Sequence, residues 1–176
     1  MKNKQLIESI TKRAKADQKL RARVQKGGIT NKEWNKVLKL DEQNIKFVKK
    51  TIDKYGWPTF DLIGKRASHY FWLLVQHADK DIKLQKKALQ SLKEEVSRGQ
   101  AYARNFAYLT DRVLTAESKK QVYGTQFIVK GKKLVVKPVR NMKKVNQLRK
   151  SASLTPLGVA TRKINKEYSG FLRGRK

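Results

Sequence analysis

The chain of 176 residues contains no cysteine, three prolines and only 14 acidic residues against 43 Lys and Arg. The absence of cysteine excludes disulfide bonds, cysteine nucleophiles and zinc–thiolate centres. Because only two histidines are present, the sequence predicts no metal site and no cofactor. The longest apolar run, 70–75, is far shorter than the roughly 18–20 residues of a membrane helix, so no membrane span is expected.

The first 15 residues are basic but contain no continuous apolar segment of the kind that a secretory signal carries. We therefore expect a cytoplasmic protein. Hydrophobic residues make up 39% of the chain, which is enough for most of it to fold around a core.

Acidic residues are scarcest in the C-terminal part of the chain. Residues 1–26 hold nine basic and two acidic side chains, residues 27–129 hold 19 and 11, and residues 130–176 hold 15 and one. About half of the net charge of +29 therefore lies in the last quarter of the sequence. This distribution predicts a folded body over 1–140 followed by a basic C-terminal helix or tail over 141–176.

A surplus of positive charge of this size favours a polyanionic partner, since each Lys or Arg that neutralises a phosphate releases a counterion. Nucleic acid, and RNA before DNA, is the partner we expect, in a ribosome-like or other ribonucleoprotein setting. A general lysine bias, an anionic membrane surface or an acidic protein partner are the alternatives. The expected phosphate contacts are Lys12, Arg13, Lys15, Lys19, Arg21, Arg23, Lys143, Lys144, Arg149, Lys150, Arg162, Lys163, Arg173, Arg175 and Lys176.

The apolar spacing of three and four residues predicts a mainly α protein, a single compact helical domain with one small β-hairpin. Thr30 and Glu33 fit a capping box at the start of a helix, and Gly27-Gly28 would end the helix before it. We expect helices over 2–24, 30–55, 62–77, from Asp79 or Asp81 to Gly99, 101–114 and 142–150, strands over 126–129 and 134–136, and a weak basic helix or flexible tail beyond Pro156.

His77 lies where an apolar helix meets a polar turn, two residues before Asp79. A helix C-terminus favours a protonated imidazole, and Asp79 could orient the ring. One interpretation is a general acid or base with its carboxylate. The other is a capping histidine, with Asp79 capping the next helix.

Asp111 and Arg112 are adjacent on a predicted helix, so they point about 100° apart and each needs a partner elsewhere. An arginine in a largely apolar helix is costly unless it meets a carboxylate or a phosphate. Arg112 is therefore either an anion clamp or half of a buried ion pair, with Asp41 or Asp17 as its partner.

The segment 121–126 is polar, carries no charge and opens the predicted hairpin. Gly124 permits a turn with free backbone N–H groups. Gln121, Tyr123, Thr125 and Gln126 could then bind the edge of a ligand, or they could satisfy the local backbone in a turn without a ligand.

Four segments resemble, in order and spacing, an uncharacterised bacterial family of domains of unknown function. They are Gly-Trp-Pro-Thr at 56–59, Gln-His-Ala-Asp at 76–79, Leu-Thr-Asp-Arg at 109–112 and Tyr-Gly-Thr-Gln-Phe at 123–127. Five further positions of the first half, and one glutamine after the histidine motif, match the same family: Asp17, Gln18, Arg21, Asp41, Asn44 and Gln85.

The family's closing segment is matched at Arg149 and Leu157, whereas 151–156 departs from its Gly-Leu-Pro-Pro run. The resemblance covers about 10–157 and implies one helical domain but no particular reaction. Its motifs are rich in polar residues, which cost free energy when buried unless they are paired. We therefore expect them to form either a shared pocket or a structural network.

A second function class follows from these motifs. In an enzyme, a metal-independent hydrolase or nuclease acting on RNA or a nucleotide, His77 would be the general base. Asp79 would orient it, and Arg112, with Asp111, would complete the catalytic group. Substrate would be positioned by Gln85, Gln121, Tyr123, Thr125 and Gln126. A third possibility is a toxin, immunity or phage-defence component that meets an acidic protein.

Overall fold

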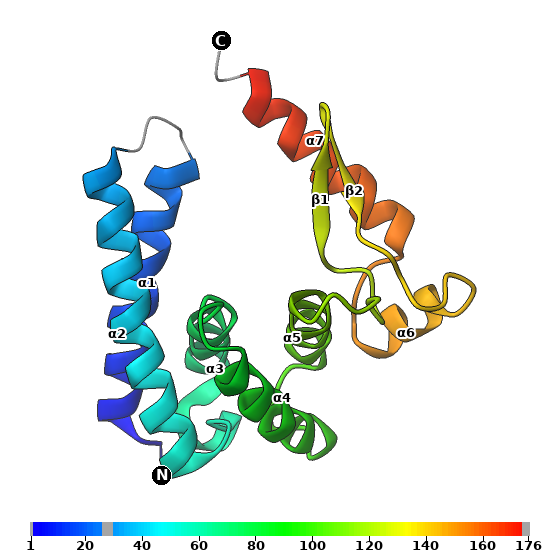
Figure 1. The fold of residues 1–176 in the computed structure, drawn as a ribbon. Helices are drawn as coiled ribbons and strands as arrows, with labels where there is room; N and C mark the ends of the chain where they lie inside the picture. Colours follow the sequence, from blue (N-terminus) through cyan, green and yellow to red (C-terminus); the bar gives the residue numbers. More distant parts are fainter. Residues whose placement is uncertain (1, 26–29, 174–176) are drawn as a thin grey trace. The chain divides into compact units, whose positions relative to one another are not determined.

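The structure is a computed structural model that describes residues 2–25 and 30–173 (Figure 1). Contacts along the chain group into two compact units, Met1–Tyr102 (unit 1) and Ala103–Lys176 (unit 2). Each unit is described by itself. Among the described residues no helix has both the length and the apolar character needed to cross a bilayer.

Unit 1 consists of helices. They are α1 (Lys4–Gln25), α2 (Asn31–Tyr55), α3 (Phe60–Gln76) and α4 (Ile82–Ser97). Helix α1 packs against both α2 and α3, and α2 also meets α3 and α4, so α1 and α2 run side by side in Figure 1. The core comes from apolar side chains at helical spacing, among them Ile10, Val48, Phe71 and Leu92, which are fully buried.

The predicted capping box at the start of α2 is confirmed. The Thr30 hydroxyl accepts from the Glu33 N–H, and the Glu33 carboxylate accepts from the Thr30 N–H at 3.1 Å. The start of α4 is capped by Asp81, whose Oδ1 accepts from the Leu84 N–H at 2.9 Å. The helix stop predicted at Gly27-Gly28 lies outside the described residues.

A tight turn at Gly56 joins α2 to α3. Gly56 has φ +64°, and a Cβ placed on it would lie 2.9 Å from Ser91 Oγ. That hydroxyl accepts a hydrogen bond from the Trp57 N–H at 2.7 Å. The turn thereby places the buried Trp57 ring edge-on against Phe71, with centroids 5.3 Å apart.

Unit 2 combines helices with a hairpin. Its elements are α5 (Ala103–Ala116), β1 (Phe127–Lys130), β2 (Lys133–Val136), α6 (Val145–Ser151) and α7 (Leu157–Arg173). The strands pair antiparallel, with Phe127 opposite Val136 and Lys130 opposite Lys133, across a turn at Gly131 and Lys132. The segment after Pro156, for which a helix and a flexible tail were both open, is the helix α7.

Helix α7 packs along β2, and a single side chain makes the link specific (Figure 1). Asn165 accepts from the Leu134 N–H through Oδ1 and donates to the Leu134 carbonyl through Nδ2, both at 2.8 Å. The side-chain amide therefore binds both backbone groups of one strand residue, as a neighbouring strand would.

The prediction of a mainly α protein with one small hairpin is confirmed. The domain boundary expected after residue 140 stays a prediction. Hydrogen bonds do link the two sides of that position within unit 2, since Arg149 binds the carbonyls of Tyr123 and Gly124.

Replacing Gly56 with alanine should destabilise the protein by about 2–4 kcal/mol, because an alanine there meets both the strained backbone region and the Ser91 hydroxyl. Gly99→Ala is the matched control. Gly99 has φ +70° but nothing within 4 Å of its Cβ position, so it should show the smaller, purely conformational loss. Urea denaturation of both variants measures the difference. Equal losses in the free energy of unfolding would show that the Ser91 contact contributes nothing to the effect.

Candidate functional site

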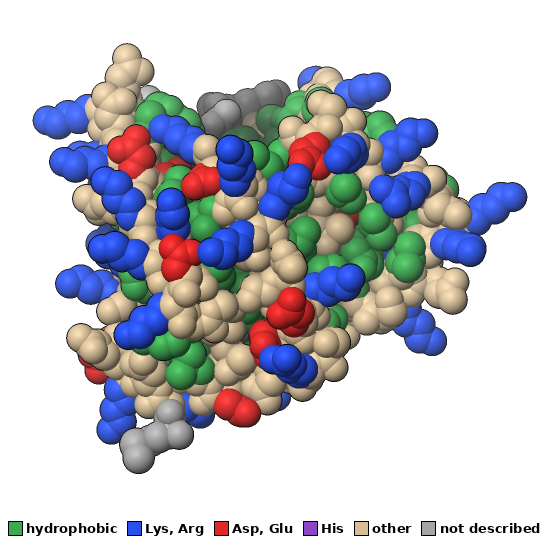
Figure 2. All heavy atoms as spheres, turned by 60° about the horizontal axis from the view of Figure 1, so that its bottom comes forward, with side chains coloured by type: hydrophobic (Ala, Val, Ile, Leu, Met, Phe, Trp, Pro, Cys, Tyr) green, Lys and Arg blue, Asp and Glu red, His purple; other side chains and the backbone are tan. Residues whose placement is uncertain are grey.

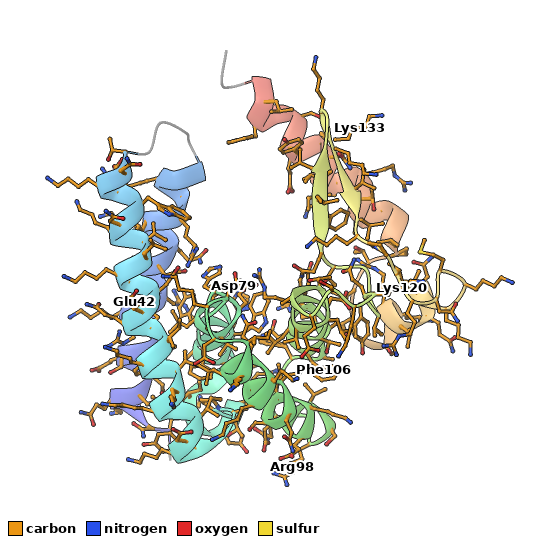
Figure 3. All side chains as sticks on the ribbon, in the orientation of Figure 1. Glu42, Asp79, Arg98, Phe106, Lys120 and Lys133 are labelled. Carbon is orange, nitrogen blue, oxygen red and sulfur yellow. The ribbon has the colours of Figure 1, made fainter. Side chains whose placement is uncertain are left out.

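His77 forms the C-terminal cap of α3, and its ring is held by a carboxylate from α1. The His77 Nδ1 atom lies 2.9 Å from Asp17 Oδ2, a contact across 60 residues of sequence. The expected orienting residue was Asp79, which lies in the turn after α3 (Figure 3). Its Oδ1 instead accepts from Gln85 Nε2 at 3.2 Å, so the assignment of Asp79 as the orienter is corrected to Asp17.

Asp17 receives several donors at once. Besides His77, Arg21 Nε lies 2.8 Å from its Oδ1, and Gln18 Nε2 lies 3.0 Å from its Oδ2. Arg21 continues to Asp41 on α2 through Nη2. Asp17 and Asp41 were the expected partners of Arg112, whereas the ion pairs observed for both carboxylates are with Arg21.

The pKa values of the two carboxylates move in opposite directions. Burial alone would raise the pKa of Asp17, but the hydrogen bond and charge of His77, together with Arg21, outweigh burial and hold it below 3.8. For Asp41, burial is not fully offset by Arg21, and the nearby Asp17 charge adds to it, so its pKa is raised. Asp17 is therefore the carboxylate of this pair that keeps its charge to the lower pH.

The chemical capacity of this cluster resides in the second ring nitrogen of His77. A charged Asp17 favours a proton on Nδ1, so the ring, in its neutral form, presents its lone pair at Nε2. His77 keeps 17% of its side chain exposed, and no hydrogen bond to Nε2 is formed within residues 2–25 and 30–173. An oriented imidazole of this kind can accept or deliver a proton.

Gln85, expected at a ligand, binds the end of α3 instead. Its Nε2 lies 3.2 Å from the carbonyl oxygens of Val75 and Gln76 and from Asp79 Oδ1. The last carbonyls of a helix lack partners within the helix, and the buried amide of Gln85 supplies one. Its role in this structure is to fix the turn that carries His77.

In unit 2, Asp111 binds the backbone rather than a reacting group. Its fully buried carboxylate accepts from the N–H groups of Val122, Tyr123 and Thr125 at 2.8–3.2 Å and from Thr125 Oγ1 at 3.0 Å. Three of the backbone N–H groups in 121–126 that were expected to be free are thus satisfied by this one side chain. Burial, with the charge of Asp111, raises the pKa of Tyr123.

The glutamines of the same segment complete a self-satisfied turn. Buried Gln121 donates through Nε2 to the carbonyls of Gln126 and Lys137, and its Oε1 accepts from the Gln126 N–H. Gln126 in turn donates to Thr125 Oγ1 at 3.1 Å. Of the two interpretations of this segment, these bonds favour local backbone satisfaction over ligand binding.

Arg149 differs from the other expected phosphate contacts because it is buried. It is 2% exposed and donates from Nε to the Thr155 carbonyl at 2.6 Å and from Nη1 to the carbonyls of Tyr123 and Gly124. Burial lowers its pKa against the raising influence of Tyr108 and Asp111. The basic residues around it in the sequence predicted an exposed side chain. Its match to the closing family segment was the feature that indicated a place in a pocket or a structural network.

Most of the other expected basic contacts lie at the surface, which carries Lys and Arg widely on the face shown in Figure 2. Arg13 stacks on Phe47 at 4.6 Å, and Arg21 is committed to its two carboxylates. The Arg173 side chain, Arg175 and Lys176 lie outside what the structure describes. The exposed members are Lys12, Lys15, Lys19, Arg23, Lys143, Lys144, Lys150, Arg162 and Lys163.

Several cations from different parts of the sequence line a groove between α1 and α2. It encloses about 380 Å³, with Lys19 and Arg23 from α1 and Lys36 and Lys39 from α2. Leu20 and Leu40 contribute to its apolar lining, and none of its described lining residues is acidic. Lys36 and Lys39 were not expected as contacts, because they belong to the mixed-sign middle of the sequence.

Within the described parts of the chain, no three His, Asp or Glu side chains come close enough together to hold a metal ion. The site in unit 1 consists of the ion-pair cluster around Asp17 and His77 and the basic groove between α1 and α2.

The comparisons with known proteins give one result. A family model, the family of unknown function DUF6624, matches residues 4–172, and the chain belongs to this family. Searches of curated proteins and of solved structures return no match. The resemblance deduced from the sequence motifs is confirmed at the level of an uncharacterised family.

Asp17 should give the protein a specific sensitivity to acid. Its folded pKa lies below its unfolded value of 3.8, so its stabilisation is present above that value and is lost as the pH falls through the folded pKa. The free energy of unfolding of the wild type should therefore fall more steeply below about pH 4 than that of Asp17→Asn. Asp53→Asn, which removes an exposed carboxylate, is the control and should retain the wild-type steepness. Identical pH profiles for the wild type and Asp17→Asn would contradict the assignment.

Proposed function

We propose that this protein binds RNA through its basic surface, with the groove between α1 and α2 as the principal contact in unit 1. The observation that carries the proposal is the convergence of Lys19, Arg23, Lys36 and Lys39 on one open groove with no acidic side chain among its described lining residues. Four cations around one groove repel one another, and a phosphate backbone reduces that repulsion while releasing counterions.

The apolar part of the groove suits a flexible strand better than a rigid duplex. Leu20 and Leu40 offer surface to sugars and bases, while the cations at the same groove reach phosphates. Exposed Arg162 on α7 supplies further positive charge in unit 2, whose sequence contains 19 Lys and Arg but only three acidic residues. The proposal therefore favours single-stranded RNA, bound without base specificity.

A variant in which Lys19, Arg23, Lys36 and Lys39 are all replaced by glutamine should bind single-stranded RNA more weakly. The slope of log affinity against log salt should become shallower by about 3, because four phosphate contacts of about 0.7 each are lost. The matched control replaces exposed Lys49, Lys50, Lys83 and Lys93, which makes the same change in net charge outside the groove. Fluorescence anisotropy at several salt concentrations gives both slopes, and an equal effect of the two variants would overturn the groove as the contact.

A second candidate function is supported by the bond between Asp17 and His77. An imidazole fixed at Nδ1 can take the proton of an RNA 2′-hydroxyl at Nε2 while the hydroxyl oxygen attacks the adjacent phosphorus. The leaving 5′-oxygen then takes a proton from the imidazolium or from water. This is metal-independent phosphodiester cleavage, and it needs no group beyond the histidine and its carboxylate to begin.

His77→Asn separates the two roles of this side chain. The asparagine amide can replace Nδ1 as the donor to Asp17, but it offers no proton acceptor at the position of Nε2. RNA cleavage should therefore disappear while the melting temperature changes little. His69→Asn, which alters the other histidine, is the control and should retain cleavage. Cleavage that persists in His77→Asn would show that His77 is not the base.

A further inference from the structure

Unit 2 contains a pocket of about 300 Å³ that the proposed function does not use. Arg149 contributes to its lining, and so do Lys163 and Glu167 from α7. Phe127, Leu154 and Ile164 provide apolar surface in the same lining. Its volume lies at the small end of the range for ligand sites, so a ligand of mononucleotide size or less can fit.

The guanidinium of Arg149 is a buried charge without a carboxylate bonded to it. Its three hydrogen bonds all go to carbonyl oxygens, and Arg149 forms no ion pair within the described residues. Carbonyls satisfy Nε and Nη1 but contribute only partial negative charge. The charge of Asp111 offsets the burial of this cation only in part, since the pKa of Arg149 is still lowered, so a further anion would stabilise it.

One donor of Arg149 remains for such an anion. Nη2 makes no hydrogen bond to any described residue, while the other guanidinium nitrogens are committed to the backbone. Those commitments fix the guanidinium plane in advance, so an anion bound at Nη2 would meet a preorganised donor. Lys163, exposed on α7 and lining the same pocket, adds a second and movable positive group.

We propose that this pocket binds a small organic phosphate monoester, with its phosphate at Arg149 Nη2 and the Lys163 ammonium and its organic body against Phe127, Leu154 and Ile164. A phosphate monoester carries close to two negative charges and three acceptor oxygens. It can therefore bind two separate donors better than a ligand with a single carboxylate can. The negative charge of Glu167 repels an anion in the pocket, so a variant that removes this charge should strengthen binding. The proposal goes beyond RNA binding at the α1–α2 groove and does not depend on it.

Isothermal titration of the full chain with adenosine 5′-monophosphate tests the site, with adenosine and ribose 5-phosphate as the two partial ligands. The complete nucleotide should bind, ribose 5-phosphate should bind more weakly, and adenosine should not bind detectably. Lys163→Gln should weaken binding by about tenfold, the loss expected for one charge-assisted hydrogen bond. Glu167→Gln should strengthen it, and Lys166→Gln, exposed on the same helix but not part of the pocket lining, should leave it unchanged.

Absence of nucleotide binding, or equal effects of Lys163→Gln and Lys166→Gln, would overturn the proposal. Because Arg149 also supports the fold, its role is tested by filling the pocket through Ala160→Phe, with circular dichroism to verify folding. A folded Ala160→Phe variant that still binds the nucleotide would equally overturn it. The groove variant should retain nucleotide binding while it loses RNA, so failure of the RNA proposal and failure of this one are distinguishable.

The phosphate can come from a free nucleotide or from the 5′-phosphorylated end of an RNA. Comparison of one oligonucleotide with and without its 5′-phosphate separates these sources. If the terminal phosphate tightens binding in the wild type and not in Lys163→Gln, the pocket takes RNA ends. If it has no effect while the mononucleotide still binds, the pocket takes the free nucleotide.

Discussion

Each unit of this protein depends on a buried carboxylate that satisfies several donors at once. Asp17 accepts from a histidine, an arginine and a glutamine, and it thereby links α1 to the end of α3 and, through Arg21, to α2. Asp111 accepts from three backbone N–H groups and one hydroxyl, which sets the path of the chain into the hairpin. Since buried carboxylates are costly unless they are fully hydrogen-bonded, these contacts must form together for either region to be stable.

The same chemistry divides the basic residues into two groups that sequence alone does not distinguish. Arg21 and Arg149 are fixed by oxygen atoms of the protein, and their geometry is determined by the fold. Lys19 and Lys163 line a groove and a pocket and are exposed. In a chain with 43 basic side chains, burial rather than residue type therefore decides which cations the protein itself holds in place and which remain exposed.

Much of the secondary structure was predictable, because helix caps and apolar spacing are local signals. The capping box at Thr30 depends on residues within a few positions of each other, and both the helices and the hairpin follow such patterns. The partner of His77 was not predictable from spacing, because Asp17 is 60 residues away and Asp79 is only two. Family resemblance placed Asp17 and Arg21 among the motif residues, and their mutual contact joins two positions four residues apart on one helix. The contact of Asp17 with His77, in contrast, required the packing of α1 on α3.

The polar motif in unit 2 illustrates a different limit. Gln121, Thr125 and Gln126 carry the donors and acceptors of a ligand site, and the same groups suit a turn that bonds to itself. Only the backbone path decides between the two, and that path is set by Asp111, ten residues before the first of them. The burial of Arg149 was not predictable for a related reason. It binds the backbone carbonyls of Tyr123 and Gly124, and the fold rather than the side-chain type determines which carbonyls come within reach.

The amide of Asn165 has a consequence for how the hairpin behaves in a crowded solution. A two-stranded hairpin has an open edge on either side, and a strand from another molecule can pair with each edge. Asn165 binds both main-chain groups of Leu134, and α7 lies along β2, so the edge at β2 is closed by the protein's own helix. A strand from another molecule can therefore pair with at most one edge of the hairpin. That edge belongs to β1, on which Ile128 and Val129 are exposed.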